Sequence, residues 1–202
     1  ASLYVNNILA KNIVIPDTVE TIGASAFLWC QSLENVIIGS GLKTMSMPGT
    51  VFDSCHELKG IWVDPDNQYF SSDDYGILFN KDHSTLIKYP NAGPAVYTVP
   101  NEVITIGQSA FSESSNLEVI YIGRGVTVIE LSAFSNCKKL KEAHLNEALS
   151  TIENYAFYQC DSLSDVYYGG TADRWDDISI GAENSGLLSA KLHIAEPVIM
   201  VN

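Results

Sequence analysis

Hydrophobic and polar residues recur along the chain with a period close to 23 positions. The shared pattern is I-x-I-P/G-x-x-V-x-x-I-x-x-x-A-F-x-x-C-x-x-L, and segments 13–35, 98–119, 120–142 and 143–165 carry it most clearly. Units begin at Ile13, Val36, Ile61, Tyr97, Ile120, Ala143 and Val166. The spacings of 23, 25, 36, 23, 23 and 23 residues describe a near-constant repeat with two insertions. Such a repeat indicates short units that bury their apolar faces only by stacking on one another.

Each unit opens with a run of alternating apolar residues, which predicts a short strand. Ile13-Val14-Ile15 and Ile120-Tyr121-Ile122 are examples. Because every unit runs in the same direction and returns to its start, these strands are expected to pair in parallel. At a strand spacing of about 4.8 Å, about seven coils form a stack roughly 30 Å long.

Equivalent positions of a stacked repeat are expected to form ladders inside the coil. A phenylalanine ladder comprises Phe27, Phe52, Phe111, Phe134 and Phe157. The residues before these are Ala26, Val51, Ala110, Ala133 and Ala156. A second ladder comprises Ile22, Met45, Ile106, Ile129 and Ile152, and a third comprises Leu33, Leu58, Leu117, Leu140 and Leu163. The sequence predicts that these side chains form one continuous core.

The repeat strings IPDTVETIGASAF, VPNEVITIGQSAF, GVTVIELSAFSNC and LSTIENYAFYQC resemble those of the BspA-like leucine-rich-repeat family of bacterial and protist surface proteins. Segments 66–90 and 166–181 match variants typical of that family. The chain departs from the pattern in the stretch MSMPGTVF and in the third unit, where a long insertion replaces the Phe-Cys turn. The resemblance implies a right-handed, strand-rich leucine-rich-repeat solenoid, an extracellular or cell-surface address, and adhesion or partner binding. It transfers no catalytic residues.

The pattern predicts one solenoid over residues 1–194. Residues 1–12 are expected to form an incomplete leading coil or a cap. In the irregular unit 61–96, segments 76–79 and 85–89 flank a five-residue loop and predict a hairpin.

The unit 166–194 is expected to cap the C-terminal end of the core. Thr171 is expected to N-cap a short helix over residues 172–178, with Asp173 favourable in its first turn. Trp175 and the run 187–194 are expected to cover the open end. Residues 195–202 are interpreted as a linker or the start of a following module.

The 202 residues are 46% hydrophobic, which is enough for a packed core, and their formal net charge is −13. Nucleic acid and anionic membranes are poor partners for that charge, which favours a soluble monomer. No apolar run approaches the roughly 18 residues of a membrane span. The opening ASLYVNNILAKN lacks the basic and apolar regions of a signal peptide.

Four cysteines occupy one repeat position, and neighbouring coils supply two pairs, Cys30 with Cys55 and Cys137 with Cys160. A ladder would place the backbones of each pair about 5 Å apart, within range of a disulfide. Because the fourth coil has Ser114 there, buried thiols are favoured over disulfides, and both over a metal site or nucleophile. Cys55 and His56 adjoin in a turn and are not expected to form a catalytic pair.

The middle residue of each strand points outward in a solenoid, so these residues predict a stripe along the sheet face. The stripe comprises Val14, Ile37, Trp62, Thr98, Tyr121, His144 and Tyr167. Trp and Tyr are enriched at binding hot spots, so Trp62, Thr98, Tyr121, His144 and Tyr167 are the candidate ligand-binding residues. The alternative is ordinary cross-strand packing. His144 alone is more typical of a surface histidine than of a metal ligand or base.

No cofactor, metal site or catalytic site is predicted. The acidic stretch 64–67 fails the calcium-loop pattern because Tyr69, not glycine, stands at the sixth position, and a solvated loop is expected. The chain has no G-x-S-x-G, H-E-x-x-H or phosphate-binding glycine loop. The favoured function is a surface or secreted module that binds a protein or glycan on a host or neighbouring cell through the sheet face. A structural spacer without a ligand is the alternative, and a cell-wall glycan-processing enzyme is a remote one.

Overall fold

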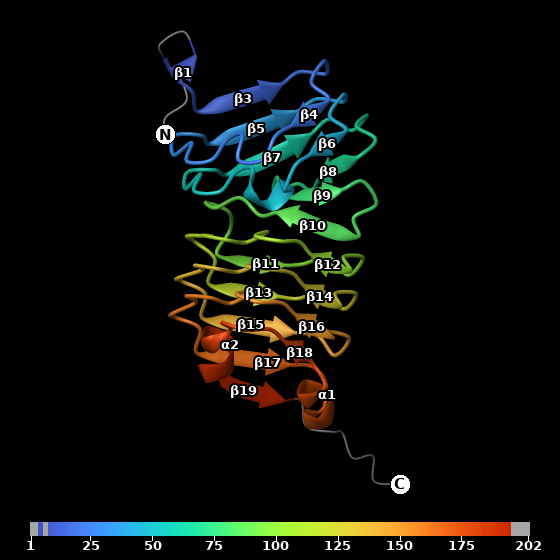
Figure 1. The fold of residues 1–202 in the computed structure, drawn as a ribbon, viewed down its shortest axis with the longest axis vertical. Helices are drawn as coiled ribbons and strands as arrows, with labels where there is room; N and C mark the ends of the chain where they lie inside the picture. The colour runs from blue at the N-terminus through green and yellow to red at the C-terminus, as the bar shows by residue number, and fades with distance from the viewer. Residues whose placement is uncertain (1–3, 6–7, 195–202) are drawn as a thin grey trace.

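Parallel strands stacked one above another form the front face of the molecule in a computed structural model that describes residues 4–5 and 8–194 (Figure 1). The N-terminal front sheet comprises β3 (Asn12–Ile15), β5 (Asn35–Ile38) and β7 (Gly60–Val63). The C-terminal front sheet comprises β11 (Val96–Thr98), β13 (Val119–Tyr121), β15 (Glu142–Leu145), β17 (Asp165–Tyr168) and β19 (Lys191–Ile194). All these neighbours pair in parallel, one repeat apart. The structure therefore confirms the strand-rich solenoid, with about eight turns in place of the seven expected.

A second side of the coil carries shorter strands, two of which pair separately near the N-terminal end. These are β4 (Thr21–Ile22) and β6 (Thr44–Met45). The other sheet runs in the order β18 (Ser179–Ile180), β16 (Thr151–Ile152), β14 (Val128–Ile129), β12 (Thr105–Ile106), β10 (Thr85–Lys88), β9 (Leu78–Asn80) and β8 (Phe70–Ser72). Pairing is parallel from β18 to β10 and antiparallel from β10 to β8. The strands on both sides of each coil thus direct apolar side chains into the interior between them.

The third side is a tight turn around the Ala-Phe pair of each repeat. Two residues four positions apart take the left-handed conformation there, as Ser132 and Asn136 do with φ of 57° and 61°. Amides inside the turn bond to the next coil, and the Phe134 amide donates to the Ala156 carbonyl at 2.7 Å. The coils are therefore hydrogen-bonded to one another on this side as well.

The predicted ladders are present in the interior. The rings of Phe111, Phe134 and Phe157 stack with centroids 4.6 and 5.0 Å apart, and Phe27 stacks on Phe52 at 5.4 Å. All five leucines of the third ladder and all five apolar residues of the second are buried. The equivalence is lost at the N-terminal end, where Phe27 is only partly buried and Ala26 is exposed, because no further coil covers them among the described residues.

The prediction of one continuous core needs correction. Buried residues form two clusters, one over the first coils and one over the later coils, and they meet at the irregular unit. Tyr89 takes the place of the missing phenylalanine there, with its ring stacked on Phe111 at 4.8 Å. Lys88 beside it is fully buried, and its Nζ lies 3.0 Å from Oδ1 of Asp53. A buried polar link therefore stands where the repeat would place apolar side chains.

The predicted hairpin is confirmed as the antiparallel pair β9–β10, with four residues, 81–84, between the strands. The strand β8, which the sequence pattern does not predict, adds a third antiparallel strand. The insertion also separates the two front sheets, since the Ile61 amide donates to the carbonyl of Gly76 from the insertion. A 3₁₀ turn, η1 (Pro48–Thr50), lies in the preceding coil.

The C-terminal unit contains the predicted helix as α1 (Ala172–Asp176), in which Thr171 Oγ1 accepts a hydrogen bond from the Arg174 amide. The helix ends before its predicted limit because Ile178 turns into the core and β18 follows. Trp175 packs edge-on against Tyr168, with ring centroids 5.3 Å apart. The run 187–194 does more than cap the core, because it spans most of α2 (Ser185–Ser189) and all of β19, which extends the front sheet.

At the other end, β1 (Tyr4–Val5) and β2 (Ile8–Leu9) form an antiparallel pair beyond β3 (Figure 1). The predicted linker 195–202 lies outside the described residues. Within the described ranges, no helix has the length and apolar character that crossing a membrane requires.

Candidate binding face

The structure divides the predicted outward stripe between the two front sheets. Trp62 lies on β7, in register with Ile37 and Val14. Thr98, Tyr121, His144 and Tyr167 lie in register on the C-terminal front sheet. The break follows from the irregular unit between β7 and β11. The candidate residues therefore form two separate surfaces rather than one.

On the C-terminal front sheet, the rings of four residues stack in a column, which we call the ring column. It comprises Tyr121, His144, Tyr167 and His193. Successive centroids are 4.2, 4.4 and 4.4 Å apart, with interplanar angles of 23°, 6° and 12°. Thr98 continues the row at the β11 end without a ring.

His193 is not among the predicted candidate residues, because the sequence predicts residues 187–194 to be a cap and not a strand of the front sheet. The string KLHI nevertheless indicates a strand, because its polar and apolar residues alternate as they do at the start of the other repeats. A parallel strand there places His193 directly beside Tyr167.

Each histidine of the ring column is held by a carboxylate on the same face. Nε2 of His144 lies 3.2 Å from Oε2 of Glu142, and Nε2 of His193 lies 2.7 Å from Oδ1 of Asp165. The hydrogen bond from His193 is the main cause that lowers the pKa of Asp165. Because the rings cover one another's faces, the column offers mainly ring edges and polar ring atoms to a ligand. Stacking of a sugar on the inner ring faces is excluded by this geometry.

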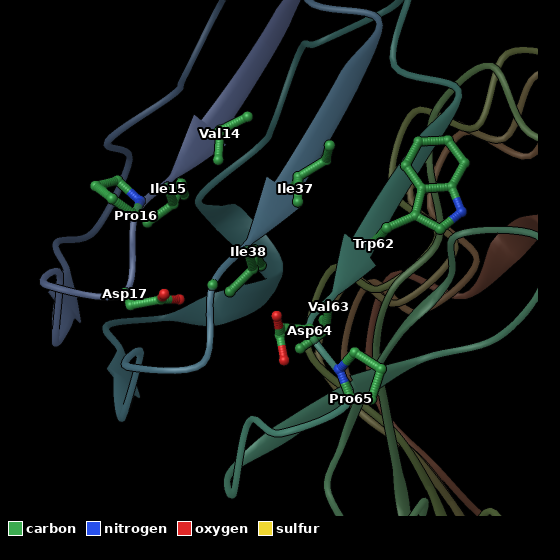
Figure 2. Close-up of a pocket in the computed structure, with 11 residues that line it drawn as sticks. Val14, Ile15, Pro16, Asp17, Ile37, Ile38, Trp62, Val63, Asp64 and Pro65 are labelled. Atoms are coloured by element: carbon green, nitrogen blue, oxygen red, sulfur yellow. The ribbon is translucent and has the colours of Figure 1, made fainter.

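On the N-terminal front sheet, three apolar side chains form an exposed row, which we call the apolar row. It comprises Val14, Ile37 and Trp62, whose exposed fractions are 67%, 47% and 37%. A depression of about 640 Å³ extends from this row to the carboxyl ends of the strands (Figure 2). The indole of Trp62 lies directly over Gly60, where a Cβ atom would be 2.2 Å from the ring. Glycine at that position lets the ring lie against the sheet and keep one broad surface open.

Two carboxylates, Asp17 and Asp64, border the depression at the ends of β3 and β7 (Figure 2). Oδ1 of Asp17 accepts the Ser40 amide at 2.8 Å, and Oδ1 of Asp64 accepts the Asp66 amide at 2.8 Å. Gly39, which directly follows β5, lies between these two residues. A Cβ atom at Gly39 would lie 2.4 Å from Oδ1 of Asp17. The missing side chain therefore keeps the space between the two acids open.

The opposite ends of the same three strands carry a charge network. Glu34 binds Lys11 at 2.6 Å and Lys59 at 2.7 Å. Hydrogen bonds from these two ammonium groups lower the pKa of Glu34 to about 2. The apolar row thus has a mutually paired charge cluster at one end and two acids at the other.

The four cysteines are free and buried. The thiols of Cys55, Cys137 and Cys160 donate to phenylalanine carbonyls of the preceding repeat at 3.0–3.1 Å. Burial raises the pKa of Cys55 and of Cys160 to about 12. The structure therefore supports the interpretation as buried core thiols and gives none of them the low pKa of a nucleophile.

The acidic stretch 64–67 is not wholly a solvated loop, because Asn67 is fully buried. Its Nδ2 donates to the carbonyls of Gly39 and Leu42, and its Oδ1 accepts the amides of Tyr69 and Phe70. Asn67 thereby links two coils. In the described part of the chain, no three His, Cys, Asp or Glu side chains gather as they would around a metal ion.

The family model for the BspA type leucine-rich-repeat region matches residues 2–81 and 95–179 in six copies. Comparison with curated proteins finds no significant match.

Two solved bacterial structures share the fold. The pneumococcal vaccine antigen PcpA superposes with a TM-score of 0.66 at 24% identity, over 94% of this chain and 57% of that one. A leucine-rich-repeat protein of Eubacterium ventriosum superposes with a TM-score of 0.60 at 19% identity, over 95% of this chain and 67% of that one. The chain thus spans a little over half the length of PcpA.

Proposed function

The chain belongs to the family of BspA-type leucine-rich-repeat proteins, and we propose that it is a cell-surface or secreted interaction module that binds a protein or glycan partner through its front sheets. The vaccine-antigen description of PcpA supports an address outside the cell. The family assignment supports an interaction module over an enzyme.

The exposed side chains of the front sheets are the observation that carries the proposal. Large apolar side chains that line up on a surface raise the free energy of the unbound protein, and contiguous patches of this kind mark interaction sites. Val14, Ile37 and Trp62 are exposed together although each has a buried neighbour in sequence, namely Ile15, Ile38 and Ile61. On the C-terminal front sheet, the side chain of Tyr121 is a second exposed aromatic group, with 40% of its surface accessible to solvent.

Substitution on both front sheets tests the proposal. The purified chain is screened on an array of extracellular-matrix proteins and glycans, and the hits are repeated with the double variant Trp62→Ala, Tyr121→Ala. We expect at least tenfold weaker binding, because aromatic residues dominate interface energies. The single variants then assign each hit to one of the two sheets.

A matched control removes two exposed apolar side chains elsewhere, Ile104→Ala with Leu188→Ala. This variant is expected to bind as the unaltered chain does. A folded front-sheet variant that retains full binding contradicts the proposal, as does an array without any hit. An array without any hit favours the alternative of a structural spacer, whereas full binding by a folded front-sheet variant means that the binding site lies elsewhere on the chain.

A further inference from the structure

The two carboxylates that border the apolar row carry charge that the fold does not use. Asp17 and Asp64 each accept one turn hydrogen bond through Oδ1. The C-terminal front sheet shows the same two turns with uncharged side chains. Oδ1 of Asn101 accepts the Arg124 amide at 3.0 Å, and Oδ1 of Asn146 accepts the Ala148 amide at 2.7 Å.

Sequence alignment of the repeats makes these positions equivalent. Asp17 and Asn101 both follow the Ile-Pro or Val-Pro step after the first strand of their sheet, and Asp64 and Asn146 both follow a strand by one residue. An amide oxygen therefore suffices for both turns. The negative charges of Asp17 and Asp64 are left available for another role.

No basic side chain lines the depression between the apolar row and these acids, within the residues that the structure describes. Lys81 donates to the carbonyl of Pro65, the residue after Asp64, at 3.1 Å. Lys11 and Lys59 stand at the other ends of the strands and bind Glu34. Two like charges in one depression repel each other, and a cation from outside relieves that repulsion. A cation close to the indole of Trp62 also gains from the negative face of the ring.

We propose that this end of the N-terminal front sheet binds a protein segment that presents a lysine or arginine close to a large apolar side chain. The apolar side chain packs on Val14, Ile37 and Trp62, and the cationic group lies between Asp17 and Asp64. This assignment rests on the proposed function and names the chemistry of the partner for one of the two surfaces.

The net charge of −13 supports a cationic partner over the other candidates. A second copy of this chain would bring the same negative charge to the contact, and so would a nucleic acid. The charge also predicts faster association with a cationic segment at low salt.

Selection from a random 12-residue peptide library on the purified chain tests the proposal. Enriched peptides are expected to carry Lys or Arg within a few residues of Leu, Ile, Phe or Trp. The affinity of one such peptide, measured by calorimetry, is expected to fall at least tenfold with Trp62→Ala. With Asp17→Asn and Asp64→Asn together it is expected to fall about 2- to 30-fold, the effect of two charge pairs at the surface.

The control variant Glu102→Gln with Glu147→Gln removes the same charge from the equivalent turns of the other sheet. Both residues are exposed, and this variant is expected to bind the peptide with unchanged affinity. Three results overturn the proposal: no enrichment, enriched peptides without basic residues, or equal losses in the two charge variants. If Trp62→Ala removes binding of an enriched neutral peptide or of a glycan, the proposed function survives and only the cationic partner is wrong.

Discussion

Phe134 lies in the middle of a ring stack and illustrates how single residues stabilise the solenoid. Its ring lies between those of Phe111 and Phe157 and is fully buried. Truncation of a buried phenylalanine costs about 3–5 kcal/mol, against a total stability of about 5–15 kcal/mol for a typical domain. We therefore expect Phe134→Ala to lower the melting temperature sharply in a thermal unfolding experiment.

The matched variant is Phe27→Ala, which removes the same atoms from a partly buried position at the end of the stack. Its melting temperature is expected to fall less. Equal losses in both variants would show that the ring stack does not depend on neighbours on both sides.

Glu34 supplies a pH-dependent contribution at the scale of one residue. Its pKa in the folded chain is about 2, below the ordinary value of 4.5, because Lys11 and Lys59 donate hydrogen bonds to it. A lowered pKa means that the contribution is complete above pH about 4.5 and is lost as the pH falls toward about 2. We expect Glu34→Gln to reduce the change in melting temperature across this interval, while Glu147→Gln leaves it as it is. If the melting temperatures of Glu34→Gln and of the unaltered chain fall by the same amount from about pH 5 to about pH 2, this prediction is wrong.

The residues of the ladders were predictable because each has copies one repeat away. The left-handed turn residues were not, although they recur with the same period. Ser132, Tyr155 and Gln159 occupy such positions, and none of these residue types signals a positive φ by itself, as glycine does. The amides of Ser132 and Tyr155 donate to the carbonyls of Asn154 and Ala182 in the next coil, and these hydrogen bonds hold the two residues in that conformation.

At the scale of elements, the irregular unit joins the two halves of the core through Lys88. This residue lies on β10 and is fully buried, with Asp53 and the Ser109 carbonyl as its acceptors at 3.0 and 3.1 Å. Asp53→Ala would leave a buried ammonium group without its counter-ion, so we expect a loss of about 3 kcal/mol or more in chemical denaturation. Lys88→Met removes the charge itself and is expected to cost less, because the Asp53 side chain is partly exposed and remains hydrated.

The decisive comparison is which of the two variants loses more stability in chemical denaturation. If Lys88→Met destabilises the chain more than Asp53→Ala, the ammonium group contributes more than its burial costs. A double variant shows whether the two effects are coupled.

The elements of the irregular unit were predicted only in part for a physical reason. The strands β9 and β10 lie next to each other in sequence and form a local hairpin, which alternation and loop residues indicate. The strand β8 pairs with β9 just as locally, but its sequence Phe70-Ser71-Ser72 has a single apolar residue and no copy elsewhere in the repeat, so neither alternation nor repetition indicates it. The burial of Asn67, which links two coils, was not predicted, because the acidic residues around it are typical of a solvated loop.

At the scale of the whole molecule, the insertion decides how the binding face is divided. The period alone predicts a single outward stripe, because it places every strand beside the next. Residues 64–95 lie between β7 and β11, so the apolar row and the ring column belong to different sheets (Figure 1). The residue types of the candidate site were therefore predictable, and their grouping into two surfaces was not.

The two ends of the stack are unequal, which predicts a gradient of local stability. In a solenoid each coil is stabilised mainly by its neighbours, so a terminal coil with one neighbour opens more readily. At the N-terminal end Phe27 is only partly buried, whereas at the C-terminal end Ile178, which follows α1, and Leu187 of α2 are buried in the core of the later coils. We expect amide hydrogen exchange to be fastest in coil 13–35, intermediate in coil 166–194 and slowest in coils 98–165. Uniform protection would instead mean that all coils open as one unit, and the apolar row would then be as rigid a surface as the ring column.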